Sequence, residues 1–118
     1  MDTPSVYDEV ARPIVADVMN GIHGSIMAYG QTSSGKTHTM MGSPGHKGII
    51  TLAVEQIFDT MVELSDQLIF DFKVSCLEIY NETVADLLDP TRTNLKISTI
   101  NDDQVRLMSG HLQFASYF

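Results

Sequence analysis

Eight consecutive residues in the first third of the chain have the types and the spacing that bind a polyphosphate. They fit the pattern G-x-x-x-x-G-K-[ST] at every fixed position and read Gly30-Gln31-Thr32-Ser33-Ser34-Gly35-Lys36-Thr37. Glycines allow backbone to approach phosphate closely, and successive N–H groups then point inward as an anion nest. We expect Lys36 to reach the β- and γ-phosphate oxygens and Thr37 to offer its hydroxyl to Mg²⁺, which prefers oxygen ligands.

The elements on either side of this loop are those that a phosphate-binding loop requires. Residues 25–29 are apolar nearly throughout, as buried parallel strands are, and a helix is predicted to begin near Lys36. The positive end of that helix would add to the attraction for an anion. A flexible Ser/Gly turn that fits the pattern by accident is the alternative, and the flanking strand and helix argue against it.

Two amphipathic helices are predicted on the N-terminal side of the chain. The first covers residues 5–20, capped by Ser5 and stopped by Asn20-Gly21, with a kink or a later start expected at Pro13. The second begins near Lys36, is interrupted by a loop at 42–48, and resumes over 49–64. Its predicted inward face is made of Ile50, Val54, Ile57, Phe58, Met61 and Leu64.

The second half of the chain is predicted to be richer in strands. Residues 68–80 alternate as a strand does, and Asn81 is expected to cap a short helix over 82–88. Residues 95–100 and 105–108, around Asn101-Asp102-Asp103, are predicted to form a hairpin. Strands that alternate with helices indicate a mainly α/β sheet.

Composition narrows the class of protein. The chain has 118 residues, 15 acidic against 7 basic side chains, a net charge of −8 and one cysteine, Cys76. This length predicts one domain at most, and the acidic charge disfavours nucleic acid as a partner. No apolar run is long enough for a membrane span and no signal peptide is seen, so we expect no membrane partner. A single cysteine suits a reducing compartment.

The residues around the loop resemble a known family. The string from Ala28 to Met40, AYGQTSSGKTHTM, is similar to the phosphate-loop sequence of the kinesin motor domain, and the likeness runs from about Val6 to Gly110. It implies an α/β, partial P-loop NTPase fold, with a sheet flanked by helices and incomplete at both ends. Residues 1–118 are then a single partial motor domain with its nucleotide-binding loop at 30–37 and a divergent tail at 111–118. Two short stretches are most similar to the centromere-associated kinesins.

The resemblance also implies ligands and partners. These are ATP and Mg²⁺, with His38 beside the adenine ring, and microtubules as the track of the intact parent motor. The loop at 42–48 matches one through which family members regulate nucleotide exchange. The expected location is the cytoplasm and cytoskeleton, with the spindle or kinetochore as a finer possibility.

Parts of the family pattern are not found in the sequence. The Arg-x-Arg-Pro adenine platform and both γ-phosphate switch motifs are absent, and phosphoryl transfer depends on such positioning groups. We therefore expect this chain to bind nucleotide with negligible turnover, and no catalytic residue is assigned.

A non-catalytic interaction module that retains the loop is the alternative. Another kind of P-loop ATPase would need a Walker-B aspartate, and none stands in a convincing place. The tail at 111–118 is expected to fray for want of a partner strand.

Overall fold

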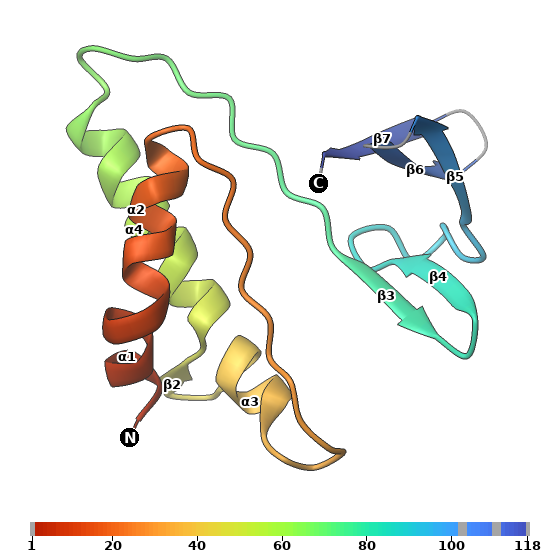
Figure 1. The fold of residues 1–118 in the computed structure, drawn as a ribbon, viewed down its shortest axis with the longest axis horizontal. Helices are drawn as coiled ribbons and strands as arrows, with labels where there is room; N and C mark the ends of the chain where they lie inside the picture. Colours follow the sequence, from red (N-terminus) through yellow and green to blue (C-terminus); the bar gives the residue numbers. More distant parts are fainter. Residues whose placement is uncertain (1, 102–103, 110–111, 118) are drawn as a thin grey trace. The chain divides into compact units, whose positions relative to one another are not determined.

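The computed structural model describes residues 2–101, 104–109 and 112–117. The chain divides into two compact units, Met1–Phe70 and Asp71–Phe118. Figure 1 shows that the first unit is mostly helical and that the second contains the longer strands. Each unit is described by itself below.

The first predicted helix is present as a continuous helical run that begins earlier than expected. It consists of α1 (Thr3–Val6), a π-helical turn η1 (Tyr7–Ala11) and α2 (Arg12–Met19). The expectation that Ser5 caps it was wrong, because Asp2 is the cap and its Oδ1 accepts a hydrogen bond from the Ser5 N–H at 3.1 Å. The predicted stop is confirmed, since Asn20 follows the last helical residue and Gly21 has a φ of +88°.

A kink or a later start was expected at Pro13; the later start was wrong, since the helical run begins at Thr3, and a π-helical turn precedes the proline. Within η1 the Arg12 N–H bonds to the carbonyl oxygen of Tyr7, five residues earlier. A proline inside a helix lacks an N–H and its ring clashes with the preceding turn. The extra residue in that turn widens it, and Pro13 then stands within the first two positions of a new α-helical segment.

The second predicted helix is also confirmed, with its interruption. It consists of α3 (Lys36–Met41) and α4 (Ile49–Glu63), separated by a small hairpin of β1 (Gly42–Ser43) and β2 (His46–Lys47). In Figure 1, α4 lies alongside the first helical run, and the chain returns as an extended segment from α2 to α3.

The core of this unit is small. Tyr7, Ala11 and Ile49 are buried together, and Ile26, Met40 and Leu52 are among the side chains that pack against them. The predicted inward face of α4 was partly wrong, because Ile50 and Phe58 are 44% and 46% exposed. The remaining predicted members of that face, Val54, Ile57, Met61 and Leu64, are half-buried.

The strands predicted before and after these helices were wrong in part. Residues 25–29 are extended but form no strand, and of residues 68–80 only β3 (Leu77–Tyr80) is a strand. An extended segment becomes a strand only when a neighbouring chain takes its hydrogen bonds, and within the described residues no strand lies beside 25–29 or 68–76.

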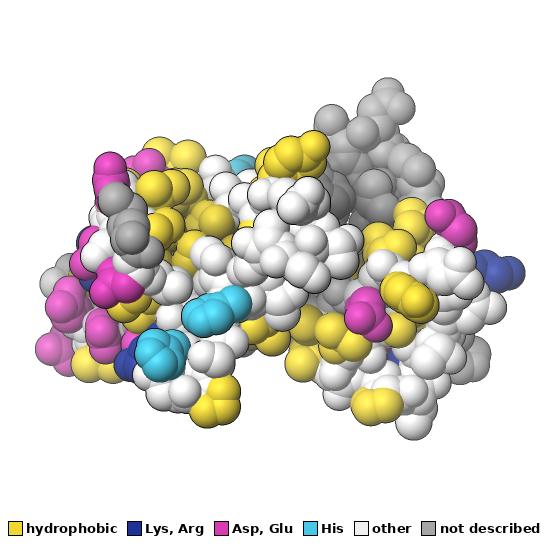
Figure 2. Space-filling model, turned by 90° about the horizontal axis from the view of Figure 1, so that it is seen from below, with side chains coloured by type: hydrophobic (Ala, Val, Ile, Leu, Met, Phe, Trp, Pro, Cys, Tyr) yellow, Lys and Arg dark blue, Asp and Glu magenta, His cyan; other side chains and the backbone are white. Residues whose placement is uncertain are grey.

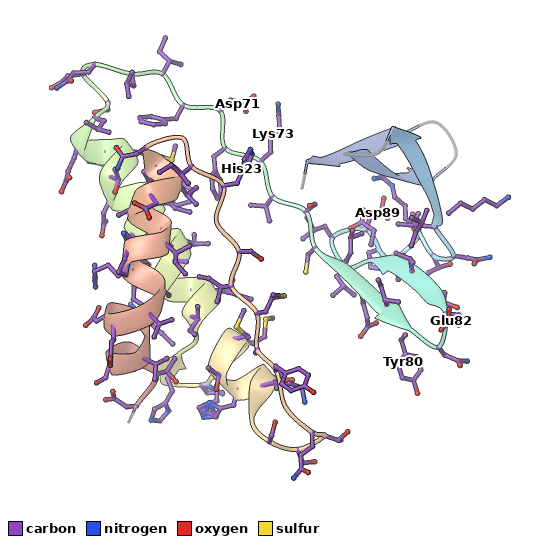
Figure 3. All side chains as sticks on the ribbon, viewed as in Figure 1. His23, Asp71, Lys73, Tyr80, Glu82 and Asp89 are labelled. Atoms are coloured by element: carbon purple, nitrogen blue, oxygen red, sulfur yellow. The ribbon has the colours of Figure 1, made fainter. Side chains whose placement is uncertain are left out.

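The short helix predicted over 82–88 was wrong. Asn81 and Glu82 both have positive φ, at 47° and 60°, which makes a tight turn of the kind that joins two antiparallel strands. The chain therefore folds back as β4 (Thr83–Asp86), which pairs with β3 along its whole length. Figure 3 labels Tyr80 and Glu82 at this turn.

The predicted C-terminal hairpin is confirmed as β5 (Lys96–Asn101) and β6 (Gln104–Ser109). Asp102 and Asp103, expected in its turn, lie outside the described residues. The frayed tail was a wrong expectation for residues 112–117, which form β7 (Leu112–Tyr117) and pair antiparallel with β6. The described strands thus make three separate antiparallel sheets, with no parallel pair among them.

Candidate phosphate-binding site

The loop between residue 30 and α3 is a sequence of turns with left-handed backbone. Ser33 and Gly35 have φ of 65° and 94°, and Gly35 caps the start of α3. A Cβ placed on Gly30 would lie 2.6 Å from the Ser34 hydroxyl oxygen, which would have to rotate away, and the Gly30 φ of +158° is one that other residues rarely adopt. The two glycines of the motif are therefore required by backbone conformation and by close approach.

The Lys36 side chain is folded back over this loop. Its Nζ donates hydrogen bonds to the carbonyl oxygens of Gly30 and Gln31, each at 2.7 Å. The loop itself is closed by a bond from the Ser34 N–H to the Gln31 carbonyl at 3.2 Å. The ammonium group is thus held at the loop by neutral acceptors, which an anionic ligand can replace.

Five of the nine predicted site residues line one pocket of about 240 Å³. They are Ser33, Gly35, Lys36, Thr37 and His38. The other four, Gly30, Gln31, Thr32 and Ser34, belong to the loop but do not line this pocket. The Thr37 side chain is exposed, and its hydroxyl has no hydrogen-bond partner among the described residues.

The charges of the helical unit distinguish Lys36 from its other described basic residues. Arg12 pairs with Asp8 and Lys47 pairs with Glu55, whereas Lys36 bonds only to carbonyl oxygens. Figure 2 shows Asp and Glu side chains gathered on this unit. A cation without a carboxylate partner in an acidic unit is suited to hold an anion.

His38 connects the loop pocket to a second cavity that the sequence did not reveal. This cavity has a volume of about 480 Å³ and is lined by residues that include Asp2, Pro4, His38, His46 and Leu52. These residues come from α1, α3, the β1–β2 hairpin and α4. Since they are far apart in sequence and share no motif, only the packing of the helices brings them together.

The described residues contain neither a cluster of metal ligands nor a helix that could span a membrane. No group of three or more His, Cys, Asp or Glu side chains is arranged to hold a metal ion there. None of the described helices combines the length and apolarity that crossing a bilayer requires.

Several kinesins are similar to this chain. The model of the kinesin motor domain matches residues 1–113. A chloroplastic kinesin-like protein of Arabidopsis thaliana, KIN-7M, is 52% identical over 95 residues, and the kinesin heavy chain of Strongylocentrotus purpuratus is 50% identical over 95 residues. These matches cover 80% and 78% of this chain but 9% of each relative.

A solved structure agrees with this assignment. It is described as the structure of a fast kinesin, with implications for its ATPase mechanism and its interactions with microtubules. The two chains superpose with a TM-score of 0.77 at 31% identity, over 98% of this chain and 34% of the solved one. The chain spans less than a tenth of these curated relatives and about a third of that structure. It has the P-loop NTPase fold of a kinesin motor in part, and it belongs to the kinesin motor domain family.

Proposed function

We propose that this chain is the ATP-binding portion of a kinesin microtubule motor. The observation that carries the proposal is the position of Lys36, an ammonium held over a glycine-bounded loop with no carboxylate partner among the described residues. Membership of the kinesin family supports ATP as the nucleotide, and the intact parent would couple its hydrolysis to movement along microtubules. The location that follows from this proposal is the cytoplasm and cytoskeleton. The more specific location that we propose is the spindle or the kinetochore.

Each predicted residue has one task in this proposal. The backbone of residues 30–35 surrounds the phosphates, and Lys36 exchanges its two carbonyl acceptors for phosphate oxygens. Thr37 supplies one oxygen ligand to Mg²⁺, which when bound neutralises phosphate charge. His38 lies where the loop pocket meets the larger cavity, which is where a base would leave the phosphates.

Titration of Mg·ATP against the wild type and Lys36→Ala tests the proposal. A charge-assisted hydrogen bond is worth about 1.5–3 kcal/mol, so we expect the variant to bind roughly 10- to 100-fold more weakly. Lys73→Ala is the matched control, because Lys73 is an exposed lysine that pairs with Asp71. It should leave the affinity unchanged.

The second candidate is the non-catalytic interaction module. It is favoured by the apolar segment 25–29, which has no strand beside it among the described residues and where another chain could pair. Equal ATP affinity of wild type and Lys36→Ala would support the module.

The proposal of an ATP-binding portion also predicts negligible phosphate release with or without microtubules. Brisk release stimulated by microtubules would contradict the argument from the missing switch motifs.

A further inference from the structure

The larger cavity next to the phosphate loop is a built feature of the helical unit. Its volume of about 480 Å³ is twice the roughly 240 Å³ of the loop pocket, and His38 lines both. A ligand with phosphates in the loop pocket therefore has space for its remaining atoms only one side chain away.

The β1–β2 hairpin contributes one side of this cavity through His46 and Lys47. Two glycines hold the hairpin closed at its base, since a Cβ on Gly42 or Gly48 would overlap neighbouring backbone. At its far strand, Lys47 Nζ bonds both carboxylate oxygens of Glu55 on α4, at 2.6 and 2.9 Å. This ion pair joins the hairpin to α4 at the residue next to His46.

The side chains around the cavity suit a flat, uncharged heterocycle better than another phosphate. Pro4 and Leu52 add apolar side chains to its lining, and His38 and His46 add aromatic rings of a kind that stacks on a base. The Asp2 carboxylate also lines the cavity, and hydrogen bonds from Ser5 keep its pKa below the usual value. A charged carboxylate repels phosphate but accepts hydrogen bonds from an amino or hydroxyl group.

We infer that the β1–β2 hairpin is a base- and ribose-binding wall of the nucleotide site. His46 contacts the base or ribose of the nucleotide whose phosphates Lys36 holds. Glu55 is a positioning residue, because it acts through Lys47 on the hairpin and does not line the cavity. The inference rests on the proposed function, and it assigns a role to residues outside the G-x-x-x-x-G-K-[ST] motif.

Two ligands separate the phosphate contacts from the base contacts. Mg·ATP and magnesium tripolyphosphate are titrated against the 118-residue chain, His46→Ala and Lys36→Ala. Because an aromatic contact is worth about 0.5–1.5 kcal/mol, His46→Ala should bind ATP roughly 2- to 12-fold more weakly and tripolyphosphate unchanged. Lys36→Ala should weaken both ligands.

Three further variants sharpen this test. His46→Phe keeps a stacking face and should recover most of the ATP affinity. Glu55→Gln removes the charge that fixes Lys47 and should weaken ATP but not tripolyphosphate. His23→Ala is the matched control, because His23 lies on the extended segment after α2 and does not line the cavity (Figure 3). It should change neither affinity.

The outcomes distinguish this inference from the proposed function. If Lys36→Ala weakens both ligands while His46→Ala binds ATP like the wild type, the hairpin assignment is wrong and the proposed function stands. If His46→Ala weakens both ligands equally, His46 acts on the loop and the assignment is again wrong. If the wild type binds neither ligand, the proposed function fails and the inference fails with it.

Discussion

The helical unit and the strand-rich unit bury their side chains in different ways. In the first, Tyr7, Ala11 and Ile49 form one buried apolar cluster between two helices. In the second, Val84 and Leu95 are buried together with the carboxylate of Asp86, while Ile79 is 70% exposed. A helix forms its backbone hydrogen bonds within itself and needs only one face packed against a neighbour. A strand needs neighbouring segments both for its backbone hydrogen bonds and for the burial of its side chains.

The largest expected effect tests the apolar cluster of the helical unit. Ile49→Ala removes a buried side chain, and such truncations cost about 2–5 kcal/mol. Ile50→Ala makes the same chemical change at a position that is 44% exposed, and it should cost far less. Thermal unfolding followed by circular dichroism measures both. Equal losses would show that this cluster does not stabilise the unit.

Asp86 is a buried polar group among the residues of the strand-rich unit whose burial is described. Asp86 Oδ1 accepts the Leu88 N–H at 2.9 Å, and its Oδ2 lies 3.6 Å from a guanidinium nitrogen of Arg92. Asp86→Ala removes this acceptor from the Leu88 N–H, and a hydrogen bond to a charged group contributes about 1.5–3 kcal/mol.

Hydrogen exchange at the Leu88 amide is the direct measurement of this second prediction. It should become faster in Asp86→Ala and change less in Asp86→Asn, which keeps an acceptor oxygen at the same place. Equally fast exchange in both variants would assign the stabilisation to the charge of Asp86, and the comparison between the units would then change.

The smallest expected effect concerns a polar contact inside the helical unit. The Tyr7 hydroxyl donates to Gln56 Oε1, and Gln56 Nε2 donates to the Arg12 carbonyl at 3.2 Å. Tyr7→Phe removes the first bond and should cost about 1 kcal/mol. Tyr29→Phe is the control, because Tyr29 is fully exposed.

The same tyrosine predicts a dependence on alkaline pH. Burial raises the pKa of Tyr7 above its usual value of 10.0. The stability that this raised pKa contributes is present below pH 10 and is lost as the pH rises through the folded-state pKa. Unfolding midpoints between neutral and strongly alkaline pH should therefore fall less in Tyr7→Phe than in Tyr29→Phe. An identical fall in the two variants would contradict the burial of Tyr7.

Features set by nearby residues could be predicted from the sequence. The Asn20-Gly21 stop and the interruption at 42–48 follow from local backbone chemistry, and both are present. The phosphate loop was found by its motif for the same reason. Its role in binding ATP stays a prediction, as do the centromere-associated subfamily and the single-domain boundaries.

Features that depend on distant partners could not be predicted in this way. Residues 25–29 have the composition of a buried strand, but a strand also needs a neighbour, and the described residues place none there. Residues 82–88 are too few for their apolar pattern to distinguish a helical turn from a strand. The positive φ angles of Asn81 and Glu82 make a tight turn, and a strand follows it. The cavity lined by His46 was missed because four separate segments build it.

The base of the β1–β2 hairpin limits where this region can change in length. Backbone meets backbone at Gly42 and Gly48, whereas a Cβ on Gly45 would have no atom within 4 Å. Inserted residues can therefore be accommodated at the tip, beside Pro44 and Gly45, without moving α3 or α4. Longer versions of this hairpin would extend outward from an unchanged base. The length and sequence of the hairpin can therefore vary without moving the phosphate loop.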